Sequence, residues 1–174
     1  MNLRYVALGM IDGTLITLGV VTATREVTTL ALALTPALAA GLSSALSNAF
    51  GAYVAETAVA GQELAEFEKH LMVPSLSSTS IGSAYSHHTY LYAATMALFA
   101  VLGASIPLLP LILLGPILLA RIIAISLALV TLFCIGAYIG TKTHRAPLVM
   151  GIRTSIVGGL VTLLAWSISA IVTA

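Results

Sequence analysis

The chain has 174 residues, of which 59% are hydrophobic and only 7% are charged, and its mean hydropathy is +1.08. Soluble domains carry about 25% charged residues, so this composition excludes a soluble protein and indicates one embedded in a lipid bilayer. The net charge of +1 leaves no basic patch for a phosphate backbone, so we expect no nucleic-acid partner. Because a membrane span needs about 20 residues, the chain has room for one transmembrane domain over residues 1–174 and little else.

Five apolar helices are expected along the chain, which predicts an all-α integral membrane protein with its termini on opposite sides of the bilayer. Their expected bounds are residues 3–24, 30–60 with a helical pattern that continues to 72, 89–114, 116–140 and 147–172. Residues 73–88 are rich in serine and have no periodic pattern, so we expect a cytoplasmic loop there.

Basic residues set the expected orientation. A cytoplasmic N-terminus places five of them inside and two outside, which agrees with the positive-inside rule. The five are Arg4, Lys69, Lys142, Arg145 and Arg153, and the two are Arg25 and Arg121. We therefore expect the N-terminus inside and the C-terminus outside, in a multi-pass protein of a prokaryotic cell membrane.

A carboxylate lies about halfway along the first helix. Insertion of Asp12 into a bilayer costs roughly 2.5 to 3.5 kcal/mol, so its presence there needs a reason. Gly9 and Gly13 flank it with the spacing that lets a second helix approach closely, and we expect them to pack in a homodimer. Asp12 is then either a polar contact that fixes a helix pair or a site for a substrate or a proton.

Polar side chains follow one side of the second helix from the membrane into water. The stripe includes Asn48, Glu56, Glu63, Glu66 and His70. The last three have the i, i+3, i+7 spacing that could offer two carboxylates and an imidazole to one divalent cation. A solvated polar face explains the same pattern equally well.

Two adjacent histidines end the serine-rich stretch. His87 and His88 could bind a metal, but adjacent residues point in different directions on a helix. Two histidines at the membrane interface are the favoured interpretation.

With these helices defined, the chain resembles the vacuolar iron transporter family, which includes the nodulin-21-like proteins. The resemblance extends over nearly the whole chain, in order. It rests on Gly9-Met10-Ile11-Asp12-Gly13 and Leu18-Gly19-Val20-Val21, on the stretch from Ala45 to Tyr53, on Gly103-Ala104-Ser105-Ile106-Pro107-Leu108-Leu109-Pro110, and on residues 132–140 and 151–159.

The resemblance implies a five-helix protomer and a homodimer with the ion pathway between the two copies of the first and second helices. It also implies export of Fe²⁺ or a similar divalent ion from the cytoplasm in exchange for protons. Asp12 would be the central carboxylate, because a buried carboxylate binds either a proton or a hard cation. Ser47, Asn48, Tyr53 and Glu56 would line the pathway with it. The candidate metal contacts are then Asp12 and Glu56 and, from their helical spacing, Glu63, Glu66 and His70.

Two departures from the family bear on the substrate. Asn48 and Ala52 stand where the family usually has methionine and glutamate, so a soft ligand that favours transition metals is absent. Glu56 could replace the missing carboxylate from a different depth. The cytoplasmic segment between the second and third helices is also reduced relative to iron-storing members of the family.

The leading hypothesis is a transporter of Fe²⁺ or Mn²⁺, with Zn²⁺ as a further candidate, that exchanges the metal for protons. No tightly bound cofactor is expected, since the metal is the substrate, and the partners are a second copy, the bilayer, metal ions and protons. Two alternatives stay open: a non-transporting assembly or partner-binding protein, and a proton-coupled exporter of a non-metal substrate. No nucleophile and base stand at a recognisable spacing, so we do not expect an enzyme.

Overall fold

The computed structural model describes residues 3–72 and 79–173, without the side chains of residues 80–86 and 173. Over these ranges the chain forms five helices: α1 (Leu3–Ala23), α2 (Leu30–Leu71), α3 (Ser80–Leu114), α4 (Leu118–Lys142) and α5 (Pro147–Thr173). All five are long and apolar enough to cross a membrane. This confirms the prediction of an all-α protein with five potential membrane spans.

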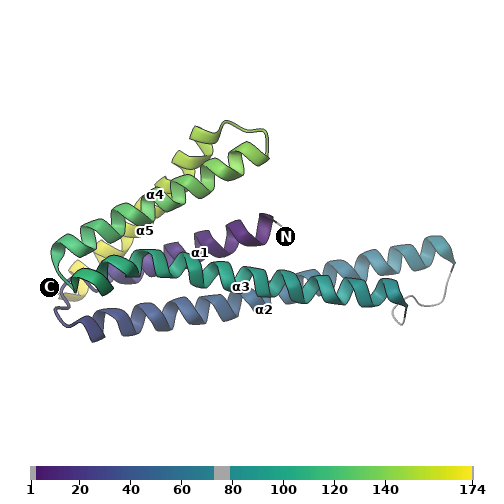
Figure 1. Ribbon diagram of the computed structural model, residues 1–174, viewed down its shortest axis with the longest axis horizontal. Helices are drawn as coiled ribbons and strands as arrows, with labels where there is room; N and C mark the ends of the chain where they lie inside the picture. Colours follow the sequence, from purple (N-terminus) through teal and green to yellow (C-terminus); the bar gives the residue numbers. More distant parts are fainter. Residues whose placement is uncertain (1–2, 73–78, 174) are drawn as a thin grey trace.

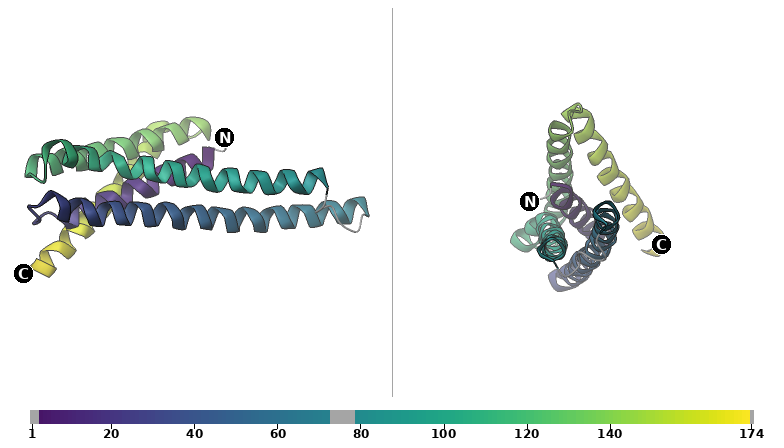
Figure 2. Two further views of the ribbon diagram at one scale, coloured as in Figure 1. Left: turned by 60° about the horizontal axis from the view of Figure 1, so that its bottom comes forward. Right: turned by 90° about the vertical axis from the view of Figure 1, so that its right-hand side faces the viewer.

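The helix α1 is the centre of the arrangement and packs against each of the other four helices. On one side of it α2 and α3 lie side by side, and on the other side α4 and α5 form a hairpin (Figures 1 and 2). The helix α2 contacts only α1 and α3. One long side of α2 is therefore uncovered within the protomer.

The pair formed by α2 and α3 is longer than the rest of the bundle. At about 1.5 Å per residue, the 42 residues of α2 extend for about 63 Å, roughly twice the thickness of the hydrocarbon core. Figure 1 shows the two helices projecting together beyond the N-terminal end of α1. This projection carries the stripe residues Glu63, Glu66 and His70 out of the apolar region.

The prediction of a loop over residues 73–88 was wrong for its second half, because α3 already begins at Ser80. Residues 73–78 lie outside the described residues. Serines are weak helix formers in isolation, but here the backbone of the stretch runs beside the extended α2 (Figures 1 and 2), and tertiary context can outweigh propensity. As a result His87 and His88 belong to a helix rather than to a loop.

Close packing of backbones joins α1 to α3. A Cβ added to Gly13 would lie 2.0 Å from the carbonyl oxygen of Ala100, and one added to Gly103 would lie 2.4 Å from that of Met10. Thr14, which is fully buried, fastens the same contact by donating from Oγ1 to the carbonyl of Gly103 at 3.1 Å. Small residues thus let the two helices touch along their main chains.

Candidate functional site

The carboxylate of Asp12 faces α2 and accepts two hydrogen bonds there. Ser44 donates from Oγ to Asp12 Oδ2 at 2.5 Å, and Asn48 donates from Nδ2 to the same oxygen at 2.5 Å. Asn48 also donates to Ser44 Oγ at 3.1 Å, so the three side chains form one connected group. They come together because Ser44 and Asn48 are four residues apart and lie on the same side of α2.

The second oxygen of the Asp12 carboxylate is not held in this way. Among the described residues, Oδ1 accepts no hydrogen bond and no cationic side chain pairs with the carboxylate. Asp12 is half-buried, whereas Ser44 is only 8% exposed. One oxygen is therefore fixed by neutral donors, and the other can accept a proton or contact a cation.

Gly9 and Gly13 do not pack in the way the sequence suggested. Both face α3 of the same chain, and a Cβ at Gly9 would lie 2.5 Å from the carbonyl oxygen of Met96. The assignment of these glycines to a dimer contact is therefore corrected. Their spacing does indicate close helix packing, but spacing alone cannot tell a helix of the same chain from one of a second copy.

A second carboxylate lies toward the N-terminal end of α1. Glu56, half-buried on α2, accepts a hydrogen bond from the hydroxyl of Tyr5 on α1. The ring of Tyr5 stacks on that of Tyr92 on α3, with the ring centroids 5.2 Å apart. Three helices thus hold Glu56 in place, about three turns along α2 from Ser44.

A cavity of about 270 Å³ between α2 and α3 begins at this point. Glu56, Glu63 and His88 line it together with Tyr92, whose ring lies 6.0 Å from that of His88. The sequence favoured an interfacial position for His88 without a ligand role. Its place beside two carboxylates follows from the pairing of α2 with α3, which the sequence pattern did not specify.

The remaining predicted residues lie outside these two groups. Glu66 and His70 are exposed on the projecting part of α2 and do not line the cavity, and Ser47 is exposed on the uncovered side of α2. The ring of Tyr53 lies near that of Tyr90 of α3, tilted by 33° with 5.3 Å between the ring centroids. Within residues 3–72 and 79–173, no three His, Cys, Asp or Glu side chains come close enough to hold a metal ion.

The predicted set Glu63, Glu66 and His70 is therefore not a complete metal site in one protomer. Residues at i and i+7 are about 10 Å apart along a helix axis, so Glu63 and His70 could share one ion only if both side chains bent toward each other. A helical stripe can supply at most part of a ligand set, and the other ligands must come from a facing helix.

Comparison with known proteins identifies the family. The sequence profile of the VIT family matches residues 66–170, which is more than half of the chain. The chain belongs to the VIT family, the vacuolar iron transporters. Membership in the VIT family indicates a membrane transporter of metal ions, in agreement with the five apolar helices.

A similar chain is an uncharacterized protein of Methanocaldococcus jannaschii. It is 29% identical over 152 residues, which cover 86% of the present chain and 79% of the relative. The match to the VIT family begins at residue 66, so Asp12, Ser44, Asn48 and Glu56 precede it. The profile match therefore assigns no role to these four side chains in this VIT protein.

Proposed function

We propose that this protein transports a divalent metal ion, with Fe²⁺ and Mn²⁺ as the first candidates, in exchange for protons. The observation that carries the proposal is the Asp12 carboxylate, which lies in the middle of a membrane span and is held on one oxygen by neutral donors. A buried carboxylate that served only as a structural contact would be expected to have both oxygens satisfied or a cationic partner.

Exchange of metal for protons follows from the chemistry of such a group. A carboxylate in a poorly solvated site binds a proton or a metal ion, and occupancy by one opposes occupancy by the other. Because neither Ser44 nor Asn48 carries a charge, neither neutralises Asp12. Both can stay hydrogen-bonded to Asp12 whether it holds a proton or a metal ion. Glu56 and the cavity beyond it offer further oxygen ligands on the way to the projecting end of α2 and α3.

We further propose that the transporter is a homodimer that pairs through α2. A row of exposed small residues follows the uncovered side of that helix at four-residue spacing, and such rows allow close helix contact in lipid. The row consists of Ala39, Ser43, Ser47, Gly51 and Ala55. It replaces Gly9 and Gly13 as the proposed contact, and it would enclose the half-exposed Asp12 between the two copies.

The test is transport by purified protein in proteoliposomes that contain a metal-sensitive dye. We expect Fe²⁺ or Mn²⁺ entry to depend on an imposed pH gradient and to be lost in Asp12→Asn, which keeps the shape of the side chain but not its charge. Glu68→Gln is the matched control, since Glu68 lies on the far side of α2 from the stripe and should leave transport unchanged.

The alternatives make different predictions in this assay. A non-transporting membrane protein that only assembles or binds a partner gives no flux for any ion in the wild type. An exporter of a non-metal substrate gives proton movement that no metal affects. A pH-driven metal flux that survives Asp12→Asn would overturn the assigned role of Asp12.

A further inference from the structure

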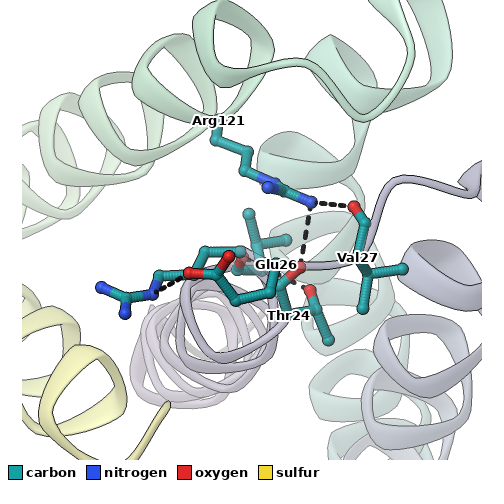
Figure 3. Close-up of polar contacts among 6 residues, drawn as sticks. Thr24, Glu26, Val27 and Arg121 are labelled. Atoms are coloured by element: carbon teal, nitrogen blue, oxygen red, sulfur yellow. Dashed lines mark hydrogen bonds and ion pairs between the residues drawn. The ribbon is translucent and has the colours of Figure 1, made fainter. Parts of the chain in front are cut away.

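An arginine is buried at the end of the bundle opposite the α2–α3 projection. Arg121, one turn into α4, is only 8% exposed, and its Nη2 donates to the carbonyl of Thr24 at 2.9 Å and to that of Val27 (Figure 3). These carbonyls belong to the connection between α1 and α2. The guanidinium therefore holds that connection against α4, but both hydrogen bonds come from a single nitrogen, Nη2.

The rest of the Arg121 guanidinium is incompletely paired. Its Nε is buried and has no hydrogen-bond partner within the described part of the chain. A buried N–H of a charged group that lacks an acceptor is unfavourable, and such a group is commonly satisfied by a ligand or an ion.

The same region holds a second arginine and one carboxylate. Arg25 Nε lies 3.0 Å from Glu26 Oε1, and the Arg25 guanidinium lies 5.2 Å from the centroid of the Trp166 ring on α5. Glu26 is 62% exposed, so water weakens its pairing. Two guanidiniums against one solvated carboxylate leave the region with an excess of positive charge.

Both arginines and the carboxylate Glu26 line one pocket of about 500 Å³, and the other walls are mostly apolar. Val21 of α1, Ile122 and Ile125 of α4, and Trp166 of α5 form those walls. The pocket thus has a cationic end beside the α1–α2 connection and an apolar wall that continues along the helices into the membrane. Arginine near a helix end and tryptophan are typical of the level at which lipid headgroups lie.

We propose that this pocket binds an anionic phospholipid, with the phosphate between Arg25 and Arg121 and an acyl chain against Ile122 and Ile125. Guanidinium groups bind phosphate oxygens in a forked, charge-assisted geometry, and an oxygen near Arg121 would supply the acceptor that Nε lacks. The apolar walls favour a phosphate that carries a chain over a free phosphate ion, since only the former covers them.

Native mass spectrometry of the full chain in a non-ionic detergent tests the proposal. Phosphatidylglycerol and phosphatidylcholine with identical acyl chains are titrated separately, and we expect phosphatidylglycerol to bind at least about tenfold more tightly. Arg25→Gln should remove most of that preference. Ile125→Trp, which fills the apolar wall and leaves both arginines in place, should weaken binding of both lipids.

The matched control is Arg145→Gln, an exposed arginine in the connection between α4 and α5. It should leave the preference unchanged, whereas an equal loss in Arg145→Gln and Arg25→Gln would mean unspecific attraction and overturn the proposal. Competition with inorganic phosphate separates the two sources of the anion. Displacement of the lipid by an equal concentration of inorganic phosphate would show that the acyl chain contributes nothing and would likewise overturn the proposal. Because Arg121 also fastens the α1–α2 connection, the test does not depend on replacing it.

Discussion

The side chains around Asp12 suit a carboxylate that changes its occupant. Ser44 and Asn48 both donate to Oδ2 and are also bonded to each other, so the carboxylate is oriented before any ion arrives. An arginine or lysine in the same position would hold the carboxylate ionised and compete with the metal. Neutral donors orient the group at a smaller electrostatic cost to metal binding.

In the proposed site, Asn48 is the residue expected to set which ions are preferred. An amide supplies a hard oxygen to a cation, whereas a thioether is soft and favours transition metals. We expect Asn48→Met to raise the ratio of the transport efficiency for Fe²⁺ to that for Ca²⁺ by several-fold, which corresponds to about 1 kcal/mol or more. Uptake of each ion into dye-loaded proteoliposomes gives the ratio.

Leu164→Met is the control for this change. It adds the same thioether to an exposed position of α5, far from Asp12, and should leave the ion preference unaltered. An Asn48→Met protein with an unchanged Fe²⁺ to Ca²⁺ ratio would mean that residue 48 orients Asp12 without contacting the ion.

At the scale of helices, the site depends on how closely α1 approaches α3. This contact fixes the rotation of α1, and with Gly9 and Gly13 turned toward α3 the intervening Asp12 is turned toward α2. We expect Gly13→Ala to destabilise the protein by about 1 to 3 kcal/mol or more, because its methyl group would meet the Ala100 carbonyl and overpack the contact. The melting temperature in detergent measures the effect.

Gly159→Ala offers a matched comparison on α5. A Cβ there meets no atom within 4 Å, and alanine favours a helix over glycine, so the melting temperature should stay level or rise. Equal losses in the two variants would show that the α1–α3 contact tolerates a methyl group and does not fix the rotation of α1.

The sequence alone could predict the elements but not their neighbours. Apolar length identified the five helices, and the cost of a charge in lipid singled out Asp12, since both depend only on local composition. The partner of Asp12 required knowing which side of α1 meets α2. Gly9 and Gly13 were assigned to a second copy because the same spacing serves contacts within and between chains.

Features that arise from tertiary contacts were also beyond the sequence pattern. The helical start of α3 at Ser80 depends on packing beside α2, and His88 reaches the cavity with Glu56 and Glu63 only through that pairing. From the sequence, Arg121 was only a basic residue on the outer side of the membrane. Its burial against the carbonyls of Thr24 and Val27 was not predictable, because these lie almost a hundred residues away in the chain.

At the scale of the whole molecule, α2 is the helix with an uncovered side, and the proposed dimer depends on it. Gly51 lies in the exposed row of small residues, and a Cβ added there meets no atom of its own protomer within 4 Å. We expect Gly51→Leu to leave the protomer folded but to weaken the dimer by about tenfold or more, since leucine would hold the two helices apart. Single-molecule subunit counting in lipid, over a range of protein density, measures the equilibrium.

Gly159→Leu is the corresponding control, because it adds the same side chain in open space on α5. A dimer that Gly51→Leu leaves intact would exclude pairing through this row. If both variants weakened the dimer equally, the loss would reflect a general effect of an added leucine on dimerisation in lipid and not a contact at Gly51.

The direction of transport depends on the orientation of the bundle in the membrane. One end of the molecule holds the N-terminus of α1, the C-terminal end of α2, the N-terminal end of α3 and the α4–α5 connection (Figure 1). The α1–α2 connection lies toward the opposite end. The first end carries Arg4, Lys69, Lys142 and Arg145, which predicts that it faces the cytoplasm. In a Cys134→Ser background, a membrane-impermeant maleimide added to intact cells should then label Thr28→Cys and not Arg145→Cys. Labelling of Arg145→Cys alone would show that the orientation is the reverse of the predicted one. The cavity lined by Glu56 and Glu63 would then face the exterior and would be a site for metal that arrives from outside the cell.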